Sequence, residues 1–242
     1  MIYKIPFYIG MIVSWLTPGR NRRRLVRGNI NVFFYYIAIA RFIKKTYNEK
    51  TKTIRFVRQV STNRMTCVVN NRYYVKVFRD VSVSQLNDYK FLLDFIRPYL
   101  DINIPEIFVA KHIPMYTADK LPGKDLRYLN KDTVIKHEAK IKSQILKMIN
   151  DMQNIPLRLI PNKERFLSGL QSDHKNKQTQ ITKNSVLAHL DLNASNFLLD
   201  DKFNVISVLD WDSVQIVPDA NIDLDNFLNL WSIYKNSKTA KP

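Results

Sequence analysis

The sequence contains little of what builds disulfides or zinc sites, with one cysteine and four histidines among 242 residues. A single cysteine excludes an internal disulfide. Cys67 stands in the apolar stretch Met65–Val69, so we expect it to pack as a small buried hydrophobe. The histidines are scattered without the spacing of zinc ligands, which argues against a structural zinc site. These features fit a reducing compartment, and we predict a cytoplasmic protein.

A long apolar run is also missing. The most apolar part of the N-terminus, residues 5–17 (IPFYIGMIVSWLT), is thirteen residues long and is interrupted by Pro6 and Gly10. A membrane-spanning helix needs about 20 apolar residues. The segment is too short to span a bilayer, and because it lacks a small-x-small cleavage site we expect no secretory signal.

Acidic residues are scarce and unevenly placed. The chain has 38 Lys or Arg against 21 Asp or Glu, a net charge of +17. Residues 1–50 hold ten basic residues and one acid, Glu49, a net charge of +9, whereas residues 186–230 hold eight Asp and one base, Lys202, a net charge of −7. This distribution suits a divalent cation or cationic substrate in the acidic part, and phosphates or an anionic membrane at the basic part.

The basic N-terminus combines arginines with aromatic residues. One interpretation is a helical hairpin lying in the lipid interface at the inner face of the cytoplasmic membrane, formed by residues 5–17 and a second apolar segment, residues 32–43. The other is a pair of basic helices packed on the main domain. No base-reading motif accompanies the charge, so nucleic acid is a disfavoured partner. The residues that would contact lipid in the first interpretation are Tyr8, Trp15, Arg22, Arg23, Arg24, Arg27, Phe34 and Tyr36.

Strand patterns begin at Thr53. The segments TIRFVRQV, MTCVV and RYYVKVF are β-branched or alternating, and Asn70 and Asn71 separate the last two as a hairpin turn would, which predicts three antiparallel strands. Lys76 falls on the opposite face to Val75 and Val77. It is either a surface lysine of the sheet or a lysine that reaches into a nucleotide cleft.

Two helices are predicted after these strands. Apolar residues from Leu86 to Leu100 recur near helical spacing, with Ser84 as the expected N-cap and Asp88 on the helix. A second periodic segment predicts one long helix from Val134 to Met152.

The stretch AHLDLNASNFLLD (188–200), followed by VLDWD (208–212), places polar residues directly beside apolar runs. FLL and VISVL predict two buried strands joined by the turn DDKFN. Asp191, Asn196 and Asp210 offer the carboxylate and amide oxygens that Mg²⁺ prefers. The alternative is that these Asx residues only shape a surface turn.

Together these segments resemble, in order, the phosphotransfer motifs of the aminoglycoside phosphotransferase and choline kinase superfamily, here a bacterial small-molecule kinase. The resemblance covers about Thr53 to Trp231 and includes STNRMTCVV, YYVKVF, PMYTADKLPGKDL, HLDLNASNFLL, VLDWD and PDANIDL. It implies an α+β, two-lobed protein-kinase-like fold with a small antiparallel-sheet N-lobe (51–118) and a mainly helical C-lobe (119–242). The basic helical N-terminal extension (1–50), predicted from its own residues, would precede these lobes.

The resemblance also implies roles for individual residues. Asp191 would be the catalytic base, and Asn196 and Asp210 the Mg²⁺ ligands. His189 is expected to hold the catalytic loop. Further residues are implied to bind ATP: Ser61, Thr62, Asn63, Lys76 and Asp88.

Three neighbouring residues have less specific assignments. We expect Asp223 to bond backbone near the catalytic loop and Trp211 to belong to the core. Asp212 is either a second metal contact or an exposed side chain.

The chain departs from the family pattern in three places. Arg58, Gln59 and Val60 stand where relatives often have glycines, so backbone amides approach the phosphates less freely. The helix acid is Asp88 rather than Glu. The segments that hold acceptor-binding helices in relatives are short here, so the acceptor site is expected to be open, completed by the N-terminal hairpin, or shared with a partner chain.

The sequence therefore predicts an ATP- and Mg²⁺-dependent kinase that phosphorylates a hydroxyl of a small or lipid-linked acceptor. A choline-like amino alcohol is preferred over a saccharide of a bacterial surface glycolipid such as lipopolysaccharide, and an antibiotic is less favoured. The alternative is a nucleotide-binding pseudokinase or a membrane-associated scaffold. The sequence gives no indication of an oligomeric state.

Overall fold

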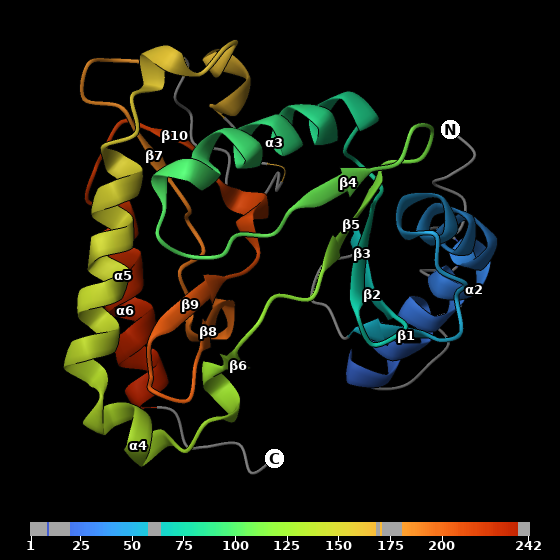
Figure 1. Cartoon of the computed structure of the whole chain (residues 1–242), viewed down its shortest axis with the longest axis horizontal. Helices are drawn as coiled ribbons and strands as arrows, with labels where there is room; N and C mark the ends of the chain where they lie inside the picture. The colour runs from blue at the N-terminus through green and yellow to red at the C-terminus, as the bar shows by residue number, and fades with distance from the viewer. Residues whose placement is uncertain (1–8, 10–19, 58–63, 168–169, 171–180, 237–242) are drawn as a thin grey trace. The chain divides into compact units, whose positions relative to one another are not determined.

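The structure is a computed structural model that describes residues 9, 20–57, 64–167, 170 and 181–236, and for residues 20–32 and 34 only the backbone (Figure 1). Contacts divide the chain into two compact units. Unit 1 comprises residues 1–90 and 106–120, and unit 2 comprises residues 91–105 and 121–242. Each unit is described by itself.

Unit 1 is built on a five-stranded antiparallel sheet in the order β1-β2-β3-β5-β4. The three predicted strands are confirmed, and the turn between β2 and β3 is made by Asn70 and Asn71 with φ angles of 53° and 55°. Asparagine tolerates this left-handed region better than most residues, which explains the Asn-Asn pair. The strands are β1 (Ile54–Val57), β2 (Arg64–Val69), β3 (Tyr73–Phe78), β4 (Ile107–Val109) and β5 (Met115–Asp119).

Helix α2 (Arg20–Tyr47) packs on β1 and β2 of this sheet (Figure 1). Its inner side buries Tyr35, Ile39 and Ile43 in a core shared with Cys67, which is itself buried as predicted. Each fully buried isoleucine contributes about 1.5–3 kcal/mol relative to an exposed one. Burial raises the pKa of the Cys67 thiol to about 12.

The other side of α2 is apolar as well as basic. Phe33, Tyr36 and Ile37 are exposed, by 77%, 46% and 63%. In the described part of the segment 32–43, Tyr35, Ile39 and Ile43 therefore belong to the core of unit 1, while Phe33, Tyr36 and Ile37 are exposed. Within the part of the chain that the structure describes, no helix is long and apolar enough to cross a membrane.

Helix α3 (Val83–Ile96) begins with a capping box two residues earlier than predicted. The Ser82 Oγ accepts the Gln85 N–H at 3.1 Å, and the Gln85 Oε1 accepts the Ser82 N–H at 2.9 Å. The prediction of Ser84 as the N-cap is therefore wrong. Ser82 is the N-cap because Gln85 stands three residues after it and completes the reciprocal pair of hydrogen bonds.

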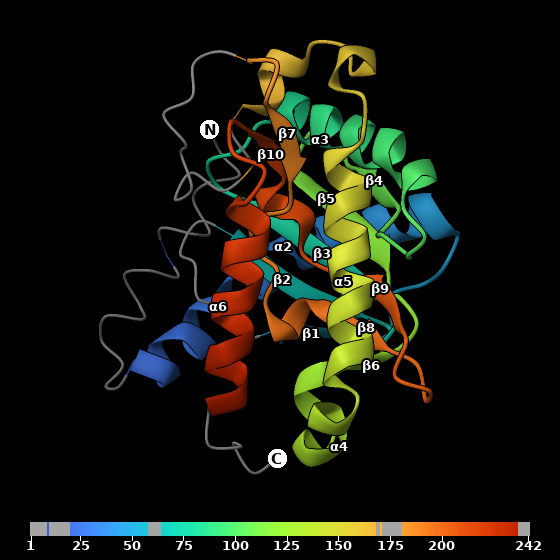
Figure 2. The same ribbon diagram turned by 90° about the vertical axis from the view of Figure 1, so that its left-hand side faces the viewer.

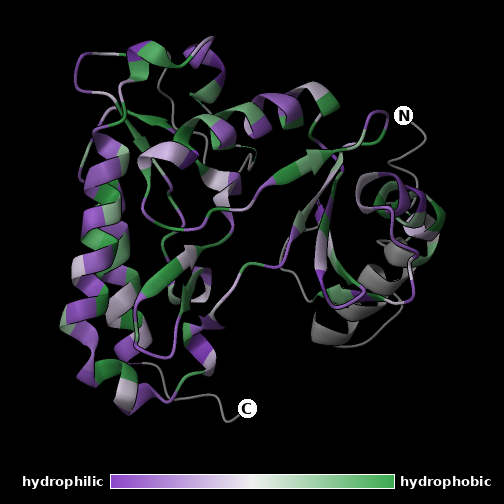
Figure 3. Ribbon diagram, viewed as in Figure 1, coloured by the Kyte–Doolittle hydropathy of each residue, from purple (hydrophilic) through white to green (hydrophobic). Residues whose placement is uncertain are grey.

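Unit 2 is dominated by helices α5 (Glu138–Gln153) and α6 (Ile222–Asn236), which lie side by side (Figure 2). Their buried sides meet an aromatic core that contains Phe197, Phe227 and Trp231. Figure 3 shows hydrophobic and hydrophilic residues along the length of α5, as expected for a helix with one buried side.

The predicted single helix from Val134 to Met152 is two helices. The first, α4 (Lys131–Lys136), is capped by Asn130, whose side chain accepts the Thr133 N–H, and the chain breaks at His137 before α5. The His137 ring stacks on Phe203 at 4.1 Å between centroids. Apolar periodicity continues across this break, which is why the sequence pattern did not reveal it.

Two small sheets complete unit 2. One has the order β6-β8-β9, and the other pairs β7 with β10. The predicted hairpin is confirmed: β8 and β9 pair antiparallel, with the turn held by Asp200, which accepts the N–H groups of Lys202 and Asn204 at 2.8 Å. The strands are β6 (Lys124–Asp125), β7 (Val186–Ala188), β8 (Phe197–Leu199), β9 (Val205–Val208) and β10 (Gln215–Val217).

Candidate active site

The loop between β7 and β8 brings Asp191 and Asn196 into direct contact. The Asn196 Nδ2 donates to the Asp191 backbone carbonyl at 2.8 Å and to its Oδ2 at 3.1 Å. The 3-10 turn η7 (Ala194–Asn196) returns the chain to this point. The two residues named by the sequence as base and metal ligand therefore share one hydrogen-bonded loop.

The same bonds fix the orientation of the Asn196 amide. Because the amide nitrogen donates to two oxygens of Asp191, the Oδ1 points the other way and remains an acceptor. An amide oxygen held in this way is suited to a hard cation.

Asp210 is tied to this loop through the residue before it. The Leu209 N–H donates to the Asn196 carbonyl at 2.8 Å, and the Leu209 carbonyl meets the His189 Nε2 at 3.2 Å. Asp210 itself has a φ of 57° and precedes the 3-10 turn η8 (Trp211–Ser213). The Asp210 charge raises the pKa of His189, against the larger effect of burial. Asp191 and Asn196 are thus bonded directly, and Asp210 is joined to them through the backbone of Leu209.

The donor set fits a magnesium ion. Asn196 offers a neutral oxygen and Asp210 a carboxylate, both hard ligands, and Mg²⁺ is commonly held by one or two protein oxygens together with phosphates and water. Among the residues that the structure describes, no cluster of three His, Cys, Asp or Glu side chains gathers as a soft or all-carboxylate site would require.

His189 holds the loop in a defined tautomer. Its Nδ1 accepts the Asp191 N–H at 3.2 Å, so the Nε2 carries the hydrogen that is donated to the Leu209 carbonyl. The ring is completely buried and stands edge-on to Trp211 at 4.6 Å. Burial lowers the pKa of His189 to about 4, against the opposing effect of Asp210. A neutral imidazole is therefore part of the folded structure.

Asp223, at the start of α6, accepts hydrogen bonds from the backbone of the same loop. Its Oδ2 accepts the His189 N–H and its Oδ1 the Leu190 N–H, each at 2.7 Å. Leu190 has a φ of 64°, a costly conformation for a residue with a Cβ. The carboxylate of Asp223 stabilises this strained turn, although burial raises its pKa to about 6.

Asp212 and Trp211 are both fully buried. Trp211 donates its Nε1–H to the Val208 carbonyl at 2.9 Å, as expected for a core residue. The interpretation of Asp212 as an exposed side chain is wrong, because η8 turns its carboxylate inward.

Unit 1 contains Lys76 and Asp88. Lys76 lies on β3 opposite Thr66 and Tyr116, on the other face from the buried Val75 and Val77. Its Nζ is 5.8 Å from the centre of the Tyr116 ring, and Tyr89 of α3 lies 6.0 Å from the same ring.

Tyr89, which follows Asp88 on α3, contacts Tyr116, the partner of Lys76 on β5, so this part of α3 lies on the Lys76 face of the sheet. Lys76 is partly buried. The remaining predicted nucleotide residues, Ser61, Thr62 and Asn63, lie outside the described residues.

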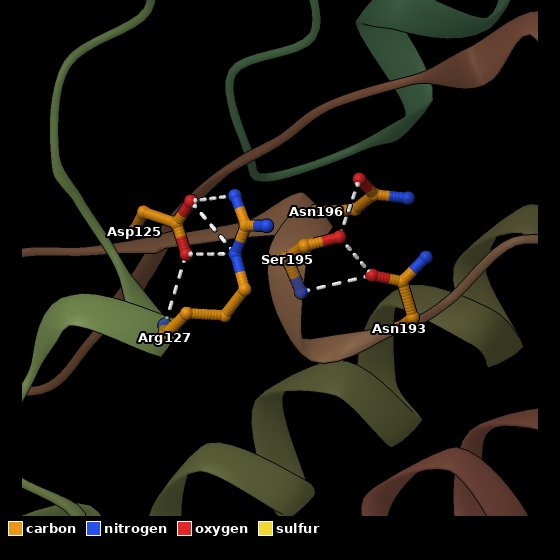
Figure 4. A network of polar contacts seen from close by, with 5 residues as sticks. All are labelled: Asp125, Arg127, Asn193, Ser195 and Asn196. Atoms are coloured by element: carbon orange, nitrogen blue, oxygen red, sulfur yellow. Dashed lines mark hydrogen bonds and ion pairs between the residues drawn. The ribbon is translucent and has the colours of Figure 1, made fainter. Parts of the chain in front are cut away.

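The structure adds two groups of contacts that the sequence did not predict: those of Asn193 with Asp191 and Ser195, and that of Asp125 with Arg127 (Figure 4). Asn193 donates its Nδ2–H to the Asp191 Oδ1 at 2.7 Å and accepts the Ser195 N–H at 2.9 Å, so it links Asp191 to the η7 turn. Asp125 and Arg127 form the second group, in and after β6. Asn193 was detectable as an Asx turn within the motif, whereas nothing in the sequence links residue 127 to this loop.

No protein-family model and no curated protein matches the sequence. Solved structures do share its fold. Aminoglycoside phosphotransferase APH(3'')-Id from Streptomyces rimosus superposes with a TM-score of 0.58 at 12% identity, over 83% of this chain and 85% of that chain. ADP-bound aminoglycoside phosphotransferase APH(2'')-Ib gives 0.57 at 15%, over 83% and 82%.

The GDP and kanamycin complex of APH(2'')-IIIa gives a TM-score of 0.57 at 15% identity, over 84% of this chain and 83% of that chain. The chain therefore has the fold of the aminoglycoside phosphotransferases, and the predicted α+β, protein-kinase-like fold class is confirmed.

Proposed function

We propose that the protein is a phosphotransferase that uses ATP and Mg²⁺ to phosphorylate a hydroxyl group of a small or lipid-linked acceptor. The observation that carries the proposal is the bonded loop of unit 2, in which Asn196 contacts Asp191 directly and Leu209 connects the loop to Asp210. The fold shared with aminoglycoside phosphotransferases supports the same reaction class.

Asp191 is the residue that acts on the acceptor. Its Oδ1 accepts a hydrogen bond from Asn193 and its Oδ2 accepts one from Asn196, which restricts its rotamer. In the proposed step the acceptor hydroxyl hydrogen-bonds to this carboxylate and passes its proton to it. The acceptor oxygen then bonds to phosphorus as the bond to the leaving phosphate oxygen breaks.

Asn196 and Asp210 would hold Mg²⁺, which when bound neutralises charge on the nucleotide phosphates. Lys76 is proposed to contact the phosphates, with Asp88 as its partner, and Ser61, Thr62 and Asn63 complete the proposed nucleotide-binding set. One solved neighbour carries GDP and another carries ADP, so both GTP and ATP should be tested as phosphate donors.

Two acceptor classes follow from the sequence. The acidic stretch around Asp191 favours a choline-like amino alcohol, and the basic N-terminus favours a saccharide linked to a surface lipid. One structural neighbour was solved with kanamycin and another with gentamicin.

Association with an anionic membrane is part of the proposal. The outward side of α2 presents Phe33, Tyr36 and Ile37, and the first 50 residues carry a net charge of +9. Apolar side chains in the acyl boundary together with basic residues against lipid phosphates are the combination that binds peripheral proteins. Such binding would bring the enzyme to a lipid-linked acceptor.

The test combines nucleotide binding with turnover. We expect ATP with Mg²⁺ to raise the unfolding temperature, and ADP to be released when amino alcohols, sugars or lipid-linked saccharides are supplied. Stabilisation without turnover of any acceptor would support a nucleotide-binding pseudokinase or scaffold instead. If neither ATP nor GTP raises the unfolding temperature, the phosphotransferase proposal is refuted.

A further inference from the structure

Asp191 has two sides, because its carboxylate oxygens have different partners. The Oδ2 accepts from Asn196, which leads through Leu209 to Asp210. The Oδ1 accepts from Asn193 at 2.7 Å, and Asn193 accepts the Ser195 N–H at 2.9 Å. The Ser195 Oγ also donates to the Asn196 Oδ1 at 3.4 Å, so Ser195 links Asn193 to Asn196. The proposed metal ligands lie on the Oδ2 side. Since in-line transfer places the incoming hydroxyl opposite the leaving group, the Oδ1 side is where an acceptor would approach.

The Ser195 turn on that side lies against the 3-10 turn η3 (Leu126–Tyr128). Leu126 is fully buried, which fixes η3 to the core of unit 2. Figure 4 shows the guanidinium of Arg127 with Asp125 on one side and the Ser195 turn on the other. A cation thus lies beside the Ser195 turn.

Arg127 is held in a defined orientation. Both oxygens of Asp125 engage it: the Nε donates at 3.1 and 3.2 Å, the Nη2 donates at 2.5 Å, and the backbone N–H of Arg127 donates to the Oδ1 at 2.9 Å. The Asp125 side chain is 16% exposed, whereas that of Arg127 is 52% exposed. The carboxylate is largely buried and the guanidinium reaches solvent, so the pair orders the cation without covering it.

Other groups make the same region basic. Lys131 has its Nζ 5.9 Å from the centre of the Tyr234 ring. Burial, and then the Asp125 carboxylate, raise the pKa of the Tyr234 phenol. Glu138 of α5 is engaged by Lys142 at 2.7 Å and Lys235 at 2.9 Å, and Asp132 lies next to Lys131 in the first turn of α4. The exposed guanidinium of Arg127 favours an anionic group over a cationic one at this position.

From this geometry we infer that Arg127 selects an acceptor that carries an anionic group, a carboxylate or a phosphate, near the hydroxyl that is phosphorylated. A planar guanidinium recognises either group by paired, charge-assisted hydrogen bonds. The inference rests on the proposed function and narrows its acceptor to acidic or phosphorylated saccharides rather than choline-like amino alcohols. Arg127 is a specificity residue and takes no part in the bond changes.

The experiment measures ADP release with four acceptors: glucose, glucuronate, glucose 6-phosphate and choline. For the wild type we expect kcat/KM to be higher with the two anions than with glucose or choline. Arg127→Ala should raise KM for the anions on the order of tenfold to a hundredfold, since a hydrogen bond to a charged group is lost, and should leave kcat within about twofold. Arg127→Lys should recover only part of the loss, because an ammonium group lacks the two parallel N–H donors of a guanidinium.

The matched control is Arg72→Ala. Arg72 is also ion-paired, to Glu49 at 2.7 Å, and its side chain is 59% exposed. Its guanidinium lies 5.0 Å from the centre of the Tyr73 ring, as that of Arg127 lies 5.5 Å from the centre of the Tyr128 ring. We expect no change in KM for any of the acceptors.

A binding measurement covers the case in which none of the four probes is turned over. With ADP and Mg²⁺ present, glucuronate or glucose 6-phosphate should raise the unfolding temperature of the wild type more than glucose does, and the difference should vanish in Arg127→Ala. Equal effects of charged and neutral sugars, or an anion effect that survives Arg127→Ala, would overturn the inference while leaving nucleotide-dependent turnover intact. Absence of nucleotide binding would instead count against the proposed function.

Discussion

His189 and Asp223 are bound to the same turn, and their titrations should affect stability in opposite directions. Burial lowers the pKa of His189 from 6.5 to about 4 and raises that of Asp223 from 3.8 to about 6. Between these values the unfolded chain binds a proton at His189 that the folded protein resists, so this contribution to stability is lost as the pH falls. At Asp223 the folded protein binds the proton more readily, so this contribution is lost as the pH rises.

The magnitudes follow from these pKa values. At about 1.4 kcal/mol per pH unit, the His189 contribution should fall by about 2 kcal/mol between about pH 7 and about pH 4.5. The Asp223 contribution should rise by about 2 kcal/mol over the same interval. The two effects therefore largely cancel in the wild type.

Single substitutions should reveal each effect. His189→Gln removes the histidine titration while keeping an amide donor for the Leu209 carbonyl, so this variant should gain stability relative to the wild type on acidification. Asp223→Asn removes the carboxyl titration, so that variant should lose stability on acidification. The free energy of unfolding is measured by denaturant at both pH values in the presence of EDTA, which keeps metal off Asp210.

Each variant is compared with itself at the two pH values, so any destabilisation that does not depend on pH cancels. The account of the buried turn would be refuted if acidification changed the free energy of unfolding in the same direction in both variants, relative to the wild type. It would also be refuted if neither variant differed from the wild type in this change.

Two further predictions concern the metal and the membrane. Asn196→Ala should raise the Mg²⁺ concentration needed for half-maximal turnover about tenfold or more, because an oxygen ligand is lost; an unchanged Mg²⁺ titration would remove Asn196 from the metal site. Ile37→Ser on the outward side of α2 should weaken binding to phosphatidylglycerol vesicles on the order of tenfold, since about 1.5–3 kcal/mol accompanies full burial of such a side chain. Ile233→Ser, at a comparably exposed position on α6 (57% against 63%), is the control, and equal binding by both variants would argue against the interfacial role.

The membrane test uses point substitutions because α2 has two faces. Removing residues 1–50 would also remove Tyr35, Ile39 and Ile43 from the core of unit 1, so a loss of binding could follow from unfolding alone. The sequence showed a basic, aromatic helix but did not separate the side that packs on the sheet from the side that faces outward.

Local signals predicted the parts of the fold that local interactions decide. Asn70 and Asn71 marked the β2–β3 hairpin because their side chains tolerate a positive φ, and the polar turn after residue 199 marked the β8–β9 hairpin. The loop that we propose to be catalytic was recognisable because Asp191, Asn196 and Asp210 stand beside buried strands in the order of the phosphotransfer motifs that they resemble.

Features that depend on tertiary contacts could not be predicted in this way. The helix break at His137 keeps apolar periodicity on both sides, and the ring stack on Phe203 that accompanies it joins distant segments. The position of Arg127 beside Ser195 depends on how β6 pairs with β8, which neither segment reveals alone. The N-cap is a different case: the Ser82–Gln85 pair was present in the sequence and outweighs Ser84 once the reciprocal bonds are considered.

Turnover by Asp191→Ala is the most direct test of the central claim that the loop of unit 2 performs phosphoryl transfer. Stabilisation by ATP with Mg²⁺ should be retained, whereas turnover should fall on the order of a hundredfold to ten-thousandfold, as expected when a general base is removed. Asp201→Ala, in the exposed β8–β9 turn with a side chain that is 83% exposed, should behave as the wild type. Wild-type turnover by Asp191→Ala would contradict the account.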